Sequence, residues 1–247
     1  MKPTFFIISI LLLACSGYAK GSDPSARKTQ ETEFRDPFAE ENGPSKTKVS
    51  DPLERVNRTF FHFNEHLYRW VLRPVSKGYR TVAPKPFREC VDRLFTNVNY
   101  PVRLVNNMLE ARLKSAGIET ARFVVNSTVG VGGLFDPASR WKLEAQPADF
   151  DQTLAIYRIP SGIYLNLPIL GPSSVRGTVG MAGDAALNPA WYFNVPIAAT
   201  VGAEGLKKVN DTSLHIEEYD DLMSATLDPY VALRSAYFES HSNRTKK

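Results

Sequence analysis

The sequence predicts a mainly α protein that folds as a single domain of amphipathic helices. Of the 247 residues, 43% are hydrophobic and 23% are charged, enough apolar material for a sizeable core, which excludes a disordered or collagen-like chain. Apolar residues recur at alternating spacings of three and four from position 53 to position 70, as one face of a helix requires. No run of roughly 18 apolar residues occurs, so no membrane-spanning helix is predicted.

The first residues have the features of an export signal. A positive start at Lys2 precedes an apolar run over residues 5–14, which is signal-peptide length. The run ends in Leu-Leu-Ala-Cys, which resembles a bacterial lipobox and predicts cleavage before Cys15 and lipidation of that residue. The Gly-Tyr-Ala of residues 17–19 offers an alternative site for ordinary signal peptidase. We favour the lipobox because the cysteine directly follows the apolar run.

Composition divides the rest of the exported chain into three parts. Residues 15–50 comprise the lipidated cysteine and then a mixture of charged residues, Ser, Pro, Gly and Thr without a sustained period, which predicts a disordered tether. Residues 51–240 carry the periodic patterns and form the expected helical domain. A polar tail, residues 241–247, follows it.

The first helix is predicted to start at Asp51, an N-cap acceptor followed by a proline. Arginines and histidines occupy its polar face, and the region of Pro74 and Gly78 is expected to end it. Its apolar stripe has two readings, a buried helical core or a surface that enters a membrane. The stripe consists of Leu53, Val56, Phe60, Phe63, Leu67 and Trp70.

Similar patterns predict further helices along the chain. One begins near Pro86 and is broken or kinked at Pro101, and the segment 160–172 is too rich in proline and glycine to be helical. The remaining helical patterns cover residues 110–126, 173–186, 195–209, 214–223 and 229–238.

Basic residues are concentrated in this first part of the domain. Residues 52–122 contain 13 Lys and Arg against 6 Asp and Glu, a net charge of +7, whereas the whole chain has +4. A basic segment favours an anionic partner, either nucleic acid or lipid headgroups. Because an exported protein does not meet the genome, we expect lipid and no nucleic acid.

A glycine-rich segment lies in the middle of the chain. Gly130, Gly132 and Gly133 alternate with apolar residues between Asn126 and Pro137, which favours a mobile hairpin or hinge over a rigid wall. A structural turn is the alternative. The glycines do not complete the G-x-G-x-x-G pattern of a nucleotide-binding loop.

Residues suited to catalysis are few. His62, Glu65 and His66 match the H-x-x-E-H pattern of zinc hydrolases, but both histidines lie on the polar helix face and no third ligand is evident. Asp149 and Asp151 are interpreted as a solvated loop rather than an acid–base pair. No G-x-S-x-G occurs. The sequence therefore predicts a protein that is not an enzyme and holds no metal or cofactor.

Cys90 lies in a helical pattern with Phe87, Leu94 and Phe95. We interpret it as a small buried hydrophobic residue rather than a reactive nucleophile.

Several motifs occur together along the chain: Asp51 to Arg58, Asn64, Arg73 to Val75, Gly78 to Arg80, Pro101, Asn106, Asn107, Asn126 to Ser139, Tyr164 to Ser173, Arg176 and Asp228 to Arg234. In combination they resemble the VacJ/MlaA family of outer-membrane phospholipid-transport lipoproteins. The resemblance covers roughly residues 51–238 in a consistent order, which makes it more specific than any short motif. The chain departs from the family at Asp151, Ala155, Arg158 and Ile163, where glycine or proline is frequent.

This resemblance implies a ring- or disc-like domain with a small glycine-rich hairpin, embedded in the periplasmic leaflet of the outer membrane. It implies a central amphipathic channel that takes mislocalised phospholipids from the outer leaflet. The implied partners are a trimeric porin and a periplasmic lipid carrier of the Mla pathway. Alternatives are a structural envelope lipoprotein without transport or a zinc-dependent hydrolase.

The resemblance also suggests roles for particular residues. Phe60, Phe63 and Trp70 would face the membrane. The channel gate or hinge would be formed by Gly130, Gly132, Gly133, Leu134 and Phe135.

Overall fold

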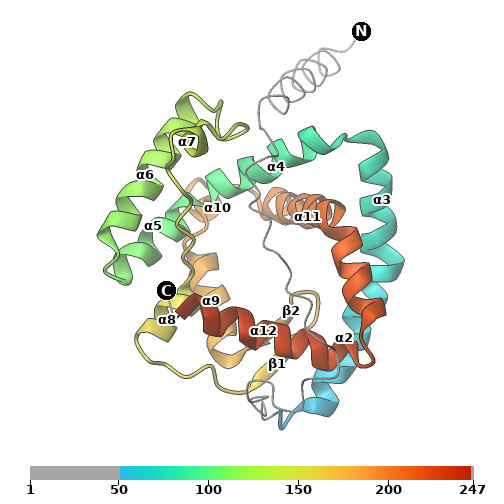
Figure 1. Ribbon diagram of the computed structural model, residues 1–247. Helices are drawn as coiled ribbons and strands as arrows, with labels where there is room; N and C mark the ends of the chain where they lie inside the picture. The colour runs from blue at the N-terminus through green and yellow to red at the C-terminus, as the bar shows by residue number, and fades with distance from the viewer. Residues whose placement is uncertain (1–50, 246–247) are drawn as a thin grey trace, which may run out of the picture.

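The computed structural model describes residues 51–245, whose helices follow one another around a ring (Figure 1). The expected signal peptide (1–14), Cys15 and the tether up to residue 50 lie outside the described residues. In the described part the chain is mainly helical, with one small antiparallel hairpin, as the sequence predicts. Within residues 51–245 no helix combines the length and hydropathy needed to cross a bilayer.

The helices differ widely in length, from one turn to several. In chain order they are α2 (Glu54–Leu67), the π-helical segment η2 (Tyr68–Leu72), α3 (Arg73–Val82), α4 (Lys85–Val98), α5 (Tyr100–Leu109), α6 (Leu113–Thr128), α7 (Pro137–Arg140), α8 (Phe150–Ile156), α9 (Val175–Ala186), α10 (Pro189–Tyr192), α11 (Ile197–Ala225) and α12 (Pro229–Thr245).

The first helix does not end at Pro74 and Gly78 as expected, because α2, η2 and α3 run without a break. A proline inside an α-helix lacks an N–H donor, and its ring collides with the carbonyl four residues earlier. The π-helical turn directly before Pro74 lets the Arg73 N–H bond the carbonyl of Tyr68, five positions back. We infer that this wider turn accommodates the proline, so the helix continues to Val82.

The other helix boundaries are partly confirmed. The chain breaks between α4 and α5, with Pro101 in the first turn of α5, as predicted. The next helix was expected from position 110 but begins at Leu113, because Ala111 has a positive φ of 57° that a helix does not allow.

The two helices expected over residues 195–209 and 214–223 form the single helix α11. It has a kink at His215, where φ is −119° and ψ is 16°. The last helix, α12, continues past its expected end at 238 and includes the first residues of the expected polar tail.

The hairpin does not lie in the glycine-rich segment, where it was expected. It lies in the proline- and glycine-rich segment that follows α8, with strands β1 (Tyr164–Leu167) and β2 (Gly171–Ser174) paired antiparallel. Ile169 and Gly171 both have positive φ values, 71° and 86°, so the connection folds back within a few residues. Residues 129–135 instead form hydrogen-bonded turns.

Most of the apolar stripe, which runs along α2 and η2, is exposed. Phe63 is 49% exposed and Trp70 is 78% exposed, whereas Asn57 and Phe61, on the neighbouring face of α2, are buried. The predicted period is therefore correct, but the buried face carries polar and aromatic side chains. The reading of the stripe as core is wrong for the isolated chain.

The described residues as a whole show the same distribution, in which polar side chains are buried and large apolar side chains are exposed. The buried apolar core is small and centres on Phe61, Tyr164 and Tyr230, whose rings meet edge to face. More polar than apolar side chains are buried, among them Asn106, Asn107 and Glu119. Many large apolar side chains are exposed, which soluble monomers seldom show as contiguous patches.

Side chains from the two ends of the described chain close the ring. The Asp51 carboxylate accepts hydrogen bonds from the Tyr230 hydroxyl and, at 3.2 Å, from Arg234, both on α12. Arg58 of α2 donates to both carboxylate oxygens of Asp228, at 2.8 and 3.2 Å. Asp51 therefore binds α12 rather than capping α2, whose N-cap residue is Leu53.

Candidate functional site

A cavity of about 240 Å³ lies between α2, η2, the hairpin and α11. Its apolar lining includes Leu67, Leu72 and Leu170. Polar and charged groups also reach it, and this mixture suits a ligand with both an apolar and a polar part. The polar lining residues are Asn64, Glu65, Tyr68, Asn166, Lys208, Asp211, Thr212, His215 and Tyr219.

Two asparagines of α2 fix the hairpin beside this cavity. Asn57 donates to the carbonyl of Tyr164 at 3.0 Å and accepts from the backbone N–H of Asn166 at 2.9 Å. Asn64, two turns further along, donates to the carbonyl of Leu167 at 2.8 Å and accepts from the N–H of Ile169 at 2.7 Å. Each side-chain amide thus satisfies one backbone carbonyl and one backbone N–H of the hairpin, as a paired neighbouring strand would, because it offers one donor and one acceptor.

An aromatic and charged cluster joins η2 to α11. The rings of Tyr68 and Tyr219 lie 4.2 Å apart, and Tyr219 donates to Glu65 at 3.0 Å. Burial and the neighbouring Asp220 carboxylate raise the pKa of Tyr68 to about 12. Burial alone would raise the pKa of Asp220, but hydrogen bonds from Arg73 and Tyr68 outweigh it and lower that pKa.

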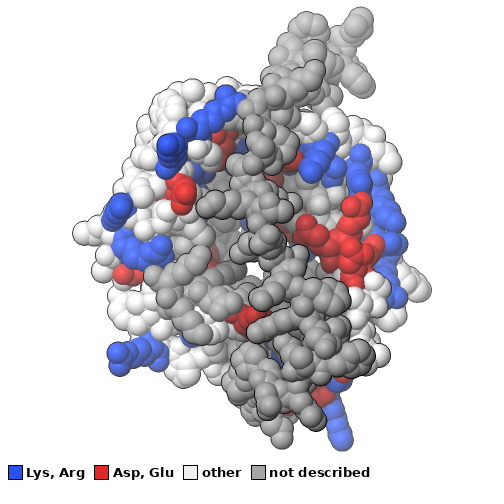
Figure 2. Space-filling view, viewed as in Figure 1, with Lys and Arg blue, Asp and Glu red and all other residues white. Residues whose placement is uncertain are grey.

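Charged side chains on α3 and α11 continue this contact along the ring. In Figure 2, Lys and Arg side chains along the edge over α3 lie next to Asp and Glu side chains over α11. Arg73 contacts Asp220 at 2.7 Å, and Arg80 contacts Glu217 at 2.9 Å. These ion pairs are largely exposed, so each adds little stability by itself.

The glycine-rich segment is held back against α6 by its backbone. The N–H groups of Gly132 and Gly133 bond the carbonyls of Ser127 and Asn126, at 3.0 and 2.8 Å. The φ angles of both glycines are positive, 72° and 97°, and a Cβ on Gly133 would lie only 2.4 Å from the Asn97 side chain. The segment therefore needs glycine for its conformation and for its close approach to α4.

A polar network fixes the end of this segment. Asn126 donates to Asp136 at 2.9 Å and accepts from the N–H of Ala138 at 3.1 Å, while Arg122 donates to Asp136 at 2.9 Å. Burial opposes the charge on Asp136, but hydrogen bonds from Ser139, Asn126 and Arg122 lower its pKa overall. Leu134 and Phe135 are the two large side chains of the expected gate. Both are half-buried and directly precede Asp136 of this network.

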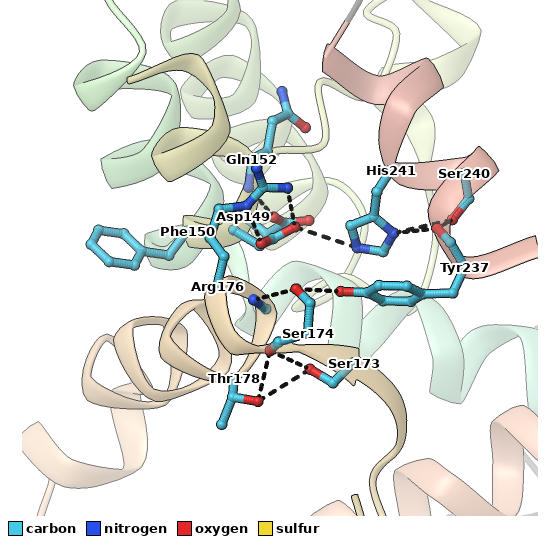
Figure 3. Close-up of polar contacts among 12 residues, drawn as sticks. Asp149, Phe150, Gln152, Ser173, Ser174, Arg176, Thr178, Tyr237, Ser240 and His241 are labelled. Carbon is cyan, nitrogen blue, oxygen red and sulfur yellow. Dashed lines mark hydrogen bonds and ion pairs between the residues drawn. The ribbon is translucent and has the colours of Figure 1, made fainter. Parts of the chain in front are cut away.

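Sequence reasoning missed a buried polar cluster between α8, α9 and α12 (Figure 3). Asp151, interpreted as part of a solvated loop, is buried and pairs with Arg176 at 2.7 Å. The Nε2 of His241 on α12 lies 3.4 Å from the same carboxylate, and Tyr237 donates to Ser174 at 3.2 Å.

A capping pattern could have predicted the short helix in this cluster. Asp149 accepts from the N–H of Gln152 at 2.8 Å and caps α8, and Asp followed three residues later by Gln marks a helix start. The burial of Asp151 depends on a partner 25 positions away, for which no local pattern exists.

The H-x-x-E-H motif makes contacts within its own helix and with α11. Glu65 pairs with Arg69 and accepts from Tyr219, while the exposed His66 contacts the carbonyl of His62 through Nδ1. Among residues 51–245, no three His, Cys, Asp or Glu side chains converge in a way that could hold a metal ion. Cys90 is buried, as expected.

These features define a class of helical ring proteins with many exposed apolar side chains, mostly polar buried side chains and a small amphipathic cavity. Residues 49–244 match the family model described as MlaA lipoprotein. The chain belongs to this family, as the motifs of the sequence indicate.

Individual relatives agree with the family match. An uncharacterised protein of Rickettsia felis is 35% identical over 190 residues, covering 76% of this chain and 75% of that protein. The intermembrane phospholipid transport system lipoprotein MlaA of Escherichia coli (strain K12) is 31% identical over 196 residues, covering 78% and 77%.

A solved structure, reported as the structural basis for maintenance of bacterial outer membrane lipid asymmetry, superposes with a TM-score of 0.69. It is 30% identical and covers 79% of this chain and 99% of that chain. The similarity therefore includes the ring itself as well as the motifs.

Proposed function

We propose that this protein is an outer-membrane lipoprotein that removes mislocalised phospholipids from the outer leaflet and passes them to a periplasmic carrier. The observation that carries the proposal is the exposure of many large apolar side chains, while most of the buried side chains are polar. A bilayer would cover the exposed apolar side chains, and the polar lining of the cavity beside the hairpin would receive part of the headgroup. The named function of the Escherichia coli relative supports this reading.

The proposed membrane-facing surface of α2 and η2 consists of Phe60, Phe63 and Trp70. All three are exposed in the isolated chain, and acyl chains would remove them from water. The basic side chains of the same region could extend toward phosphate groups while their methylene stems stay among apolar neighbours. The protein would then lie in the periplasmic leaflet without spanning the membrane.

The cavity beside the hairpin is the proposed part of the lipid path. Its volume of about 240 Å³ is less than that of sites that enclose a whole drug-sized ligand, roughly 300–1,000 Å³. It would therefore hold a headgroup or one segment of an acyl chain at a time. No covalent step is needed, because the lipid only changes its surroundings.

The proposed gate comprises Gly130, Gly132, Gly133, Leu134 and Phe135. The backbone conformation supports this role, because Val131, Gly132 and Gly133 all have positive φ angles. Val131 is also exposed. The segment would move as a unit, because Asn97 donates to the carbonyl of Gly132 and the N–H of Gly133 bonds the carbonyl of Asn126. A fixed turn is the competing role for the same geometry.

A lipid anchor at Cys15 and two partners, a porin trimer and a periplasmic carrier, complete the proposal. Cys15→Ala should release the protein from the outer-membrane fraction or leave it uncleaved in the inner membrane. Unchanged fractionation with a mature N-terminus at Lys20 would instead indicate ordinary signal peptidase.

The transport function can be tested by labelling outer-leaflet phospholipid in a deletion strain. The wild-type gene should restore low outer-leaflet phospholipid, whereas Leu170→Asp, which places a charge in the cavity, should restore it poorly at normal protein abundance. Leu227→Asp is a matched control, because Leu227 is fully exposed and lies outside the cavity. Normal lipid asymmetry in the deletion strain would contradict transport and favour a structural lipoprotein.

A zinc-dependent hydrolase remains the second alternative. Metal analysis of the purified protein tests it, since stoichiometric zinc lost in His62→Ala and His66→Ala would revive the H-x-x-E-H hypothesis.

A further inference from the structure

The segment that joins α9 to α11 is uncharged over an unusual length. Residues 185–203 contain no Asp, Glu, Lys or Arg, although 23% of the whole chain is charged. This segment, which we call the α10 tip, includes the end of α9, the short helix α10 and the first two turns of α11. In Figure 1, α10 is drawn faint, on the far side of the ring from α12.

The apolar side chains of the α10 tip are exposed rather than packed. Phe193 is 79% exposed, Ile197 is 71% exposed and Tyr192 is 69% exposed. Val201, on the following turn of α11, is also exposed. A contiguous apolar surface of this kind marks an interface with lipid or with another protein.

The backbone of the α10 tip favours lipid over water as its surroundings. Pro189 and Pro196 stand at the starts of α10 and α11, where a helix otherwise leaves N–H groups without partners. The Asn188 side chain caps α10 by accepting from the N–H of Ala190 at 3.0 Å. In hydrocarbon each unsatisfied backbone group costs several kcal/mol, so these devices matter most there.

Hydrogen bonds within the tip satisfy further groups. The N–H of Phe193 bonds the carbonyl of Pro189, the N–H of Val195 bonds that of Ala190, and the Tyr192 hydroxyl donates to the carbonyl of Ala186. The polar atom of the most exposed tyrosine is thus turned back to the tip's own backbone. A surface meant for water or for a polar partner has no need of this arrangement.

Charged residues mark where the tip would emerge from the bilayer. Asp184 precedes it on α9, and Glu204 with Lys207 follows it on α11. At 1.5 Å per residue, the seven residues from Ile197 to Ala203 extend about 10 Å. That depth is reached by interfacial helices, and it is less than one hydrocarbon leaflet of about 15 Å.

We propose that the α10 tip inserts into the acyl chains of the membrane, more deeply than the stripe of α2. The inference rests on the proposed membrane location of the ring, and it adds which element penetrates furthest. The occupant of this surface is bilayer hydrocarbon. The tip therefore orients the ring, with α10 toward the bilayer centre.

Depth-dependent quenching tests the proposal on the full-length protein in phosphatidylethanolamine–phosphatidylglycerol vesicles. An environment-sensitive fluorescent amino acid is placed at position 193 or at position 63, and the lipids carry bromine either near the headgroup or near the chain end. We expect the probe at position 193 to be quenched best by the deep bromines, and the probe at position 63 by the shallow ones.

The possible outcomes separate this inference from the proposed function. A probe in water at position 193 with a quenched probe at position 63 would overturn the inference and leave the membrane location standing. Water exposure of both probes would overturn both. Shielding at position 193 without bromine quenching would mean that a protein, either a second copy or another partner, covers the tip, and would also overturn the inference.

Charged variants provide a second measurement. Phe193→Asp and Ile197→Asp should each weaken vesicle binding about tenfold or more, because a carboxylate would have to enter hydrocarbon. Leu227→Asp is the control, since Leu227 is even more exposed than Phe193 and Ile197 but lies outside the tip. Equal binding of all three variants would contradict the proposal.

Discussion

The guanidinium Nε of Arg176 lies 2.7 Å from Oδ1 of Asp151, in an ion pair buried between α9 and α8. Arg176 also donates to the carbonyl of Ile159 at 2.8 Å, so one side chain ties α9 to α8 and to the segment that follows it. This residue belongs to the family motif, and its position in the structure indicates a role in assembling the ring rather than in contacting lipid.

Replacing Arg176 should therefore destabilise the protein. Arg176→Met leaves the Asp151 carboxylate buried without its guanidinium partner, and the free energy of unfolding should fall by about 3 kcal/mol. Arg80→Met removes an exposed pair with Glu217 and should cost less than about 1 kcal/mol. Denaturant unfolding in detergent measures both variants. An equal decrease in the free energy of unfolding for both variants would show that the buried ion pair stabilises the protein no more than the exposed one.

Asp184 should make stability depend on pH. Burial raises the pKa of its carboxyl from 3.8 to about 6, and Asp149 and Asp151 act in the same direction. The folded state then binds this proton more tightly than the unfolded state. Its contribution is fully present below about pH 4 and is lost as pH rises through 6, a change on the order of 2 kcal/mol.

Asp184→Asn should remove this pH dependence and stabilise the protein at pH 7. The remaining Oδ1 can still accept from Asn106 and from the N–H of Phe150, both at 3.0 Å. Asp228→Asn should do the opposite at pH 7, because a hydrogen bond from Arg58 lowers the pKa of Asp228. Unfolding measured from pH 4 to pH 7.5 distinguishes the two slopes, and parallel curves for wild type and Asp184→Asn would refute the assignment.

Substitutions at three glycines should separate gating from folding. Gly132→Ala meets no neighbour and suffers only from its positive φ, at a cost of about 1 kcal/mol. Gly133→Ala adds a collision with Asn97, and Gly130→Ala would place Cβ 2.5 Å from backbone oxygens, so both should lower protein abundance. If the segment gates transport, Gly132→Ala should change outer-leaflet phospholipid at normal abundance. Normal asymmetry at normal abundance would contradict a gate.

Asn64 should control the local stability of the hairpin. Asn64→Ala removes a donor to Leu167 and an acceptor for Ile169, so amide hydrogen exchange over residues 164–174 should become about tenfold faster or more. Thr59→Ala is the control, because Thr59 lies on the same helix and its hydroxyl bonds only the carbonyl of Arg55. Unchanged hairpin exchange in Asn64→Ala would show that strand pairing alone holds the hairpin.

The periodic patterns predicted most of the helices, because spacings of three and four reflect local backbone geometry. They did not predict which side of α2 is buried. Asn57 and Asn64 occupy the interior since each pairs with the hairpin about a hundred positions away. Only the tertiary fold makes that partner available, so hydrophobicity alone left open whether the apolar stripe is buried in the protein.

The candidate site was harder to predict for the same reason. Tyr219 and Leu170 meet at the cavity from α11 and the hairpin, and no spacing in the sequence links them. The expected end of the first helix at Pro74 was wrong, because the rule that proline ends a helix assumes regular α geometry. The π-helical turn η2 departs from that geometry. The family motifs identified the protein class but not the cavity. A motif indicates which residues family members have in common, and it does not indicate which of these residues are in contact in the fold.

Asp51 lies 179 positions from Tyr230 and 183 from Arg234, so the seam of the ring joins nearly opposite ends of the folded chain. Helices α2 to α6 can form as they are synthesised, but this seam cannot close until the last helix has been made. Loop closure over such a separation slows folding. A chain that stops before Asp228 would lack every contact that fastens Asp51 and Arg58 to α12, and α2 would then be held to the later part of the chain by its remaining contacts, which include the asparagine bonds to the hairpin.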